Sequence, residues 1–204
     1  MVKRRLLIFV ALLAVSGGCS SSGGQAISVD AARKAAAVGK PVNCPVAFDL
    51  PSALKSGGVN ETATLDSADA EVSKTDTAAA DPLAAQQNGM SALDAAAGAY
   101  IECDYRIGGN TLDIRLVATR AKAAIALLAP QIQRDAHLAV AELQAFINTK
   151  PGPGEVKTAG GTVAVGGLAA DGGDAALMVT SDVPELHDDA LRKVTETLAA
   201  QVKF

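Results

Sequence analysis

The sequence contains no Trp, and its aromatic residues are limited to two Tyr and four Phe. So few aromatic side chains offer little surface on which bases or sugars stack. The 18 Lys and Arg residues are outnumbered by 22 Asp and Glu, which gives a formal net charge of −4. Nucleic-acid binders need clustered basic residues for their phosphate contacts. The composition therefore excludes a general nucleic-acid-binding function.

Histidine is also scarce, because only His137 and His187 are present. They form no His-x-x-x-His pair, whereas a zinc site takes three or four converging ligands. The stretch 171–174 (Asp-Gly-Gly-Asp) lacks the further spaced oxygens that Ca²⁺ requires, so we interpret it as a turn. No Gly-x-Ser-x-Gly motif marks a serine nucleophile. We therefore predict no metal ion, no cofactor and no catalytic residues, and expect that the chain is not an enzyme.

The N-terminal end is basic and then apolar. Residues 1–5 include three positive charges, and residues 6–15 are an unbroken apolar run followed by the small residues Ser16, Gly17 and Gly18. Ten helical residues reach only about 15 Å, roughly half of a bilayer core. We predict that residues 1–18 are an export signal peptide that is removed.

The residue that follows this segment is Cys19, and the motif Val15-Ser16-Gly17-Gly18-Cys19 resembles the lipobox of bacterial lipoproteins. In that family the Cys becomes the mature N-terminus and carries acyl chains, which hold a protein on a membrane durably when there are two or more. The resemblance predicts lipidation at Cys19. A plain secretory signal with an incidental Cys is the alternative.

The segment after Cys19 is rich in Ser and Gly. Residues 19–26 have the composition of a flexible tether, which would keep the rest of the protein close to the lipid head groups. Residues 27–204 suit one domain in length. Without residues 1–18, the remaining 15 basic and 22 acidic residues give a net charge of −7.

If Cys19 carries lipid, Cys44 and Cys103 remain as an even pair in an exported chain. Export places them in an oxidising compartment, where a disulfide is the expected state. The bridge would close a loop of about 60 residues and stabilise the fold by roughly 4 kcal/mol. The alternatives are a metal-binding pair or a nucleophilic Cys.

Hydrophobic patterns predict a mixed α+β domain, with one antiparallel sheet of hairpins packed against a long helix and a C-terminal amphipathic helix. The clearest signal is a hairpin with strands at 100–107 and 111–117 and a turn at 108–110. In it Leu112, Ile114 and Leu116 face the core, and Arg115 faces out. The long helix is predicted over 121–149, kinked or split at Pro130. We expect helices to cover one face of the sheet.

Five further expectations concern other segments of the chain. The Ala-rich stretch 27–38 predicts a first helix with Ser28 as its N-cap, and a short helix is expected near Pro51. Residues 59–98 are poor in large apolar side chains, which predicts a low-complexity surface excursion that contributes little burial. Short strands are expected at 162–165 and 175–179. The last helix is expected to begin within residues 182–185.

The lipobox, the Ser/Gly tether and the Cys44 and Cys103 pair, the latter in a Cys-x-Tyr strand, together resemble small actinobacterial lipoproteins of an uncharacterised family, a domain of unknown function. The sensor domains of actinobacterial Ser/Thr kinases are a more distant comparison. The resemblance implies no enzymatic activity and no site residues.

These observations predict a lipid-anchored protein on the extracytoplasmic face of the cell membrane. Its domain would be a non-catalytic binding or accessory module whose partner is an unknown envelope protein or small ligand. One alternative is a lipid or glycolipid carrier with an apolar cavity between the sheet and its helices. Another is an envelope hydrolase, for which the sequence selects no catalytic carboxylate pair.

Overall fold

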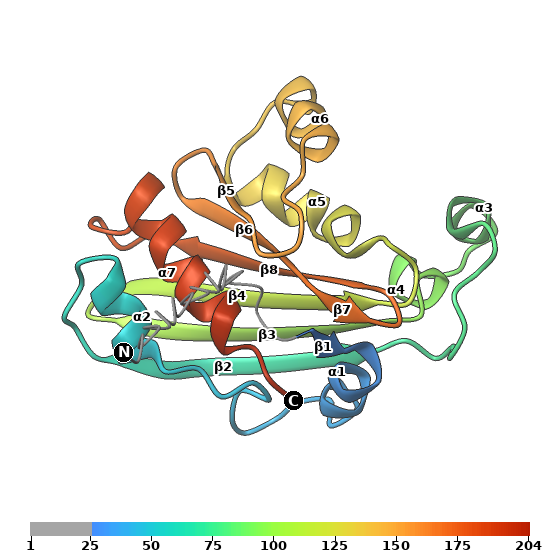
Figure 1. The fold of residues 1–204 in the computed structure, drawn as a ribbon, viewed down its shortest axis with the longest axis horizontal. Helices are drawn as coiled ribbons and strands as arrows, with labels where there is room; N and C mark the ends of the chain where they lie inside the picture. The colour runs from blue at the N-terminus through green and yellow to red at the C-terminus, as the bar shows by residue number, and fades with distance from the viewer. Residues whose placement is uncertain (1–25) are drawn as a thin grey trace, which may run out of the picture.

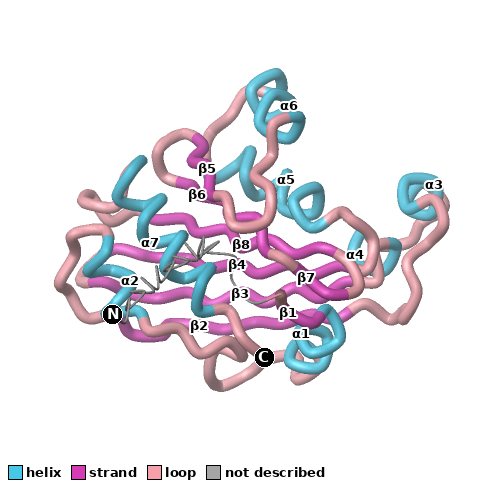
Figure 2. Tube along the Cα trace, in the orientation of Figure 1, coloured by secondary structure: helices cyan, strands magenta, loops and turns pink. Residues whose placement is uncertain are grey.

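The computed structural model describes residues 26–204, and the prediction of a signal peptide over 1–18 falls outside them. The described chain forms a six-stranded sheet in the order β2-β3-β4-β8-β6-β5 with antiparallel neighbours, and helices pack against it (Figures 1 and 2). The prediction of an α+β fold is confirmed.

The strands are β1 (Ile27–Ser28), β2 (Ala63–Val72), β3 (Gly98–Ile107), β4 (Asn110–Thr119), β5 (Val156–Ala159), β6 (Val163–Leu168), β7 (Ala170–Asp171) and β8 (Asp174–Ser181). The helices are α1 (Val29–Ala36), α2 (Leu50–Ser56), α3 (Pro82–Gln87), α4 (Ala92–Ala95), α5 (Ala124–Asp135), α6 (Val140–Asn148) and α7 (Asp188–Gln201).

The hairpin β3–β4 lies at the centre of the sheet. Its turn contains Gly108 at φ +60°, a conformation that glycine adopts without steric cost. Register pairs Cys103 with Ile114 and Tyr105 with Leu112, so the apolar residues of both strands share one face. All four side chains are buried in the same core cluster. The predicted hairpin and its core face are therefore confirmed.

Helices cover both faces of the sheet, whereas the sequence predicted cover on one face. The larger core lies between the sheet and helices α1, α2 and α7. A second core forms on the opposite face, where α5 packs over β4, β8 and β6 and is joined by α6. Val117, Ala176 and Met178 alternate with the residues of the first core and supply the sheet side of the second.

The prediction of a surface excursion over 59–98 is wrong for residues 63–72 and for residues 95–98, which are buried at the end of the segment. Residues 63–72 form β2, which pairs along β3 with an irregularity between Leu65 and Ser67. The strand places Ala63, Leu65, Ala68 and Ala70 against the first core, so small side chains suffice there. Further along, α3 buries no residue, which agrees with the expectation for that part.

The predicted long helix over 121–149 is two helices, and they separate at residues 136–139 instead of Pro130. Pro130 is tolerated inside α5 because it lies on the exposed side of the helix. Pro130 has no N–H, so the Ala126 carbonyl loses its helical partner, and Ala126 is exposed as well. The helix ends where His137 takes φ +53°. A Cβ on Gly160 would lie 2.3 Å from the Ala136 carbonyl oxygen, so the β5–β6 turn packs directly on this helix end.

The three other predicted helices, α1, α2 and α7, are present, but their bounds differ from the predicted ones. Helix α4 was not predicted. Ser28 caps α1 by accepting from the Ala31 N–H, and α2 begins one residue before Pro51. The last helix begins at Asp188, not at 182–185. The Asp182 carboxylate instead accepts from the Thr111 N–H, which ties the segment before α7 to β4. Among the described helices, none has the length and apolar character needed to cross a bilayer.

Candidate functional site

Cys44 and Cys103 form a disulfide, as the sequence predicted. Cys103 lies on the core face of β3, between Ala68 on β2 and Ile114 on β4. Cys44 belongs to the segment between α1 and α2, which contains no helix or strand. The bridge therefore attaches this segment to β3, the second strand of the sheet. Cys19, the predicted lipidation site, lies outside the described residues.

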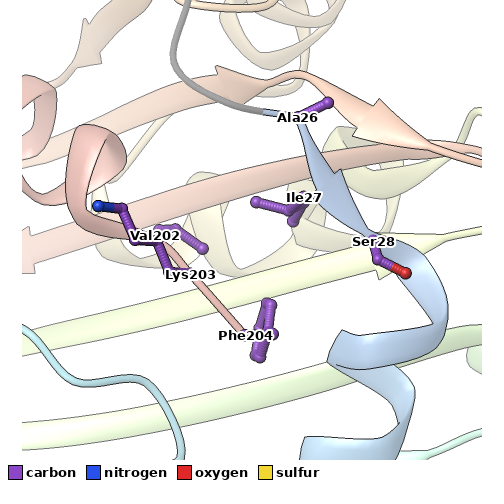
Figure 3. Close-up of a pocket in the computed structure, with 6 residues that line it drawn as sticks. All are labelled: Ala26, Ile27, Ser28, Val202, Lys203 and Phe204. Carbon is purple, nitrogen blue, oxygen red and sulfur yellow. The ribbon is translucent and has the colours of Figure 1, made fainter.

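A cavity of about 290 Å³ lies where the two ends of the described chain meet (Figure 3). Its lining joins β1 to the residues that follow α7 and comprises Ala26, Ile27, Ser28, Val202, Lys203 and Phe204. Small-molecule sites usually measure about 300–1,000 Å³. The cavity is thus at the small end of that range, and the lipid-carrier alternative, which requires room for a whole lipid, stays a prediction.

A second feature is a network of charged side chains centred on Arg115, on the face of the sheet that also carries α5. The Arg115 guanidinium donates to Glu102 Oε1 at 2.6 Å and to Asp135 Oδ2 at 2.8 Å. Tyr100 donates from its hydroxyl to Glu102 Oε2 at 3.0 Å, and Thr180 Oγ1 lies 3.4 Å from Arg115. Because only 10% of the Arg115 side chain is exposed, these partners hold it in one position.

Burial and neighbouring charges act together on the groups of this network. Burial opposes the charge on Arg115, but Glu102 and the other acids outweigh it and hold the pKa of Arg115 above its ordinary value. Burial also raises the pKa of Tyr100, and the charge of Glu102 adds to this effect. The network is therefore ionised at Arg115 and protonated at Tyr100 at neutral pH.

Asp104 and Asp113 lie directly opposite each other on β3 and β4, beside this network. Asp104 accepts from the Ser67 hydroxyl through Oδ2 at 2.5 Å, but its Oδ1 is buried without a hydrogen-bond partner. Burial raises the pKa of Asp113 to about 6, and the negative charge of Asp104 adds to the shift. Arg115 is 3.8 Å from Asp113 and compensates only in part.

The sequence did not predict the Arg115 network, because it placed Arg115 on a solvent-facing side of the hairpin. That interpretation is wrong, since α5 covers this side and brings Asp135 to the guanidinium. One signal in the sequence could have predicted this cover. The apolar stripe of residues 121–149 has to pack against an apolar surface, and the second face of the sheet provides it.

Neither histidine lines the cavity or forms a hydrogen bond with the Arg115 network in the described chain. His137 is exposed between α5 and α6, and His187 precedes the first residue of α7. Within residues 26–204, no three His, Cys, Asp or Glu side chains are grouped as metal ligands. No family model matches this chain, and neither a curated protein nor a solved structure is similar to it.

Proposed function

We propose that this protein is a lipid-anchored lipoprotein of the extracytoplasmic membrane face, and that its folded domain is a non-catalytic binding or accessory module of the cell envelope. The observation that carries the proposal is the bridge between Cys44 and Cys103. Structural disulfides persist in exported proteins and are rare in reducing compartments. The bridge therefore supports export, which the N-terminal sequence predicts independently.

Anchoring through Cys19 is tested by Cys19→Ala in the cells that produce the protein. The variant should leave the membrane fraction for the medium or remain unprocessed, because it has no thiol to acylate. Mass spectrometry of the parent N-terminus should find acyl chains on Cys19. A variant that is processed and membrane-bound like the parent would refute the anchor.

The surface that we assign to partner binding is the outer face of β2 and β3. Asp69 and Glu71 are exposed on β2, on the same side as Glu102 and Asp104 of β3. In the described chain, no basic side chain forms an ion pair with Asp69 or Glu71. These two carboxylates therefore remain available to a partner.

Crosslinking in native membranes tests this surface. Asp69→Asn/Glu71→Gln should remove the crosslinked partner bands that the parent gives. A matched variant, Asp171→Asn/Glu185→Gln, removes two exposed charges outside β2 and should keep these bands. If both variants crosslink like the parent, the partner does not bind this face.

A further inference from the structure

Residues 80–91 form an arm that leaves the sheet between β2 and β3 and carries α3 at one end of the molecule (Figure 1). None of these residues is buried, and the two large apolar side chains, Leu83 and Met90, are 66% and 39% exposed. In the described chain, the hydrogen bonds of residues 80–90 join only members of this segment to one another. The arm is therefore attached to the domain mainly through its two ends.

The base of the arm, in contrast, is bonded across its two ends. The Ala79 N–H donates to the Ala95 carbonyl oxygen at 2.9 Å, and the Thr75 hydroxyl donates to the Asp94 carbonyl oxygen at 2.6 Å. Beyond these bonds, β2 pairs with β3 and continues the sheet. Segments with few buried contacts open at a low free energy, whereas paired strands do not. The arm can therefore open without disturbing the sheet.

The disulfide connects the same two parts of the domain that the arm connects. Cys44 precedes the arm and Cys103 follows it. The part before the arm contains α1, α2 and β2, and it meets the part after the arm where β2 pairs with β3 and where α2 packs on α7. These contacts do not involve the arm, so a break in the arm leaves them and the bridge in place.

We propose that residues 80–91 are a site of limited proteolysis, and that the Cys44–Cys103 bridge holds the two resulting chains together as one folded domain. An endopeptidase adds water across one peptide bond of the arm, which leaves a new carboxylate and a new amino group and releases no peptide. Exposed loop tips with few contacts to the fold are the preferred sites of such cleavage. The inference does not depend on the anchoring proposed above.

Thermolysin, which cleaves on the N-terminal side of large apolar residues, tests the site on the full chain without reductant. Among residues 26–204, the first cut should fall before Leu83 or Met90. Val42 is the matched control, because it is 92% exposed but lies close in sequence to the bridged Cys44 and to the buried Val46. Exposure alone would favour a cut at Val42, whereas attachment to the core protects it. A first cut at Val42 instead of the arm would overturn the site.

Substitutions in the arm supply a second test of the site. Leu83→Ser/Met90→Ser should lose the first cut, because it removes both large apolar side chains of the arm. Val140→Ser removes a 75% exposed apolar side chain from α6 and should keep the cut. Both variants change only exposed side chains, so their thermal melts should match that of the parent. An unchanged first cut in Leu83→Ser/Met90→Ser would also overturn the site.

The cut protein itself tests retention by the bridge. It should migrate as one species on a non-reducing gel and as two fragments after dithiothreitol, which is oxidised as it converts the bridge into two thiols. Its melting temperature should not depend on protein concentration before reduction and should rise with concentration afterwards, because the two chains then associate as separate molecules. Cut Cys44→Ala/Cys103→Ala should show this dependence without reductant. Unfolding on the first cut, or a concentration-independent melt after reduction, would overturn the retention.

Discussion

At the scale of single residues, the most unusual arrangement is the pair of carboxylates at Asp104 and Asp113. Like charges directly opposite each other in a sheet are destabilising. The pair is tolerated because Ser67 donates to Asp104 and because Asp113 holds its proton to a higher pH than usual. Protonation removes one of the two charges, so folding and proton binding are coupled at this position.

We predict that the protein is less stable at pH 7 than at pH 4.5. The folded pKa of Asp113 is about 6, above the ordinary value of 3.8, so its contribution is fully present below that ordinary value. The contribution is lost as pH rises through 6, because folding then requires burial of a charge that the unfolded chain exposes to water. The loss should be about 1–2 kcal/mol, after allowance for screening of a carboxylate that is 24% exposed.

Urea unfolding at pH 4.5, 6 and 7 measures this dependence, and Asp113→Asn supplies the control. The asparagine variant cannot titrate at this position, so its free energy of unfolding should fall less over the same interval. Identical pH dependence in parent and variant would show that Asp113 does not carry the effect.

Arg115 provides the second prediction at this scale. In Arg115→Met, Glu102 and Asp135 lose the cation that compensates their partly buried charges, and the free energy of unfolding should fall by about 2–4 kcal/mol. Arg106→Met is the matched control, because Arg106 pairs with Asp66 where both side chains are half-exposed. It should cost no more than about 1 kcal/mol. Similar losses in both variants would contradict the role of burial.

At the scale of elements, the predictions succeeded where the side-chain pattern decides the structure. The β3–β4 hairpin alternates apolar and polar residues and has glycine at its turn, so both signals agree. Strand β2 was missed because Ala, Ser and Asp are poor strand formers. Its place is set by backbone bonds to β3, which a sequence pattern does not display. The end of α5 likewise depends on Gly160, a contact from a distant turn.

Strand β2 and the part of the chain around α3 should therefore respond differently to substitution. Ala70→Asp places a carboxylate on the buried face of β2 and should lower the melting temperature markedly, with a loss of about 2–4 kcal/mol. Replacing residues 81–90, which include α3, by a Gly/Ser linker of equal length should cost less than about 1 kcal/mol, because α3 buries nothing. Thermal melts compare the two variants. A larger loss from the linker than from Ala70→Asp would show that α3 packs more than its burial indicates.

At the scale of the molecule, the composition and periodicity were sufficient for the α+β class and for the disulfide partners. The second core was not predicted, because β4 and β8 show one apolar face each in the first core and mix polar and apolar residues on the other. The cavity also could not be predicted, since it joins residues 26–28 to residues 202–204. Contacts between segments so far apart in sequence arise from the fold as a whole.

The disulfide joins two parts of the described fold that lie far apart in the sequence. It links residues 59 apart, from a segment without helix or strand to β3, the second strand of the six. In the chain-entropy account, closing a loop of this length disfavours the unfolded state by about 4 kcal/mol. Many residues of the first core are Ala, which bury little area each, so the bridge supplies a large share of a stability near 5–15 kcal/mol.

We therefore predict that Cys44→Ala/Cys103→Ala melts well below the parent, with a loss of about 2–5 kcal/mol. Alanine is the preferred replacement because Cys103 is buried, and serine would add the cost of burying a hydroxyl. Reductant should lower the melting temperature of the parent to near that of the variant and should leave the variant unchanged. Thiol titration of the exported, unreduced Cys19→Ala protein should find no free thiol. Two free thiols in the folded protein would refute the bridge and remove the main support for export.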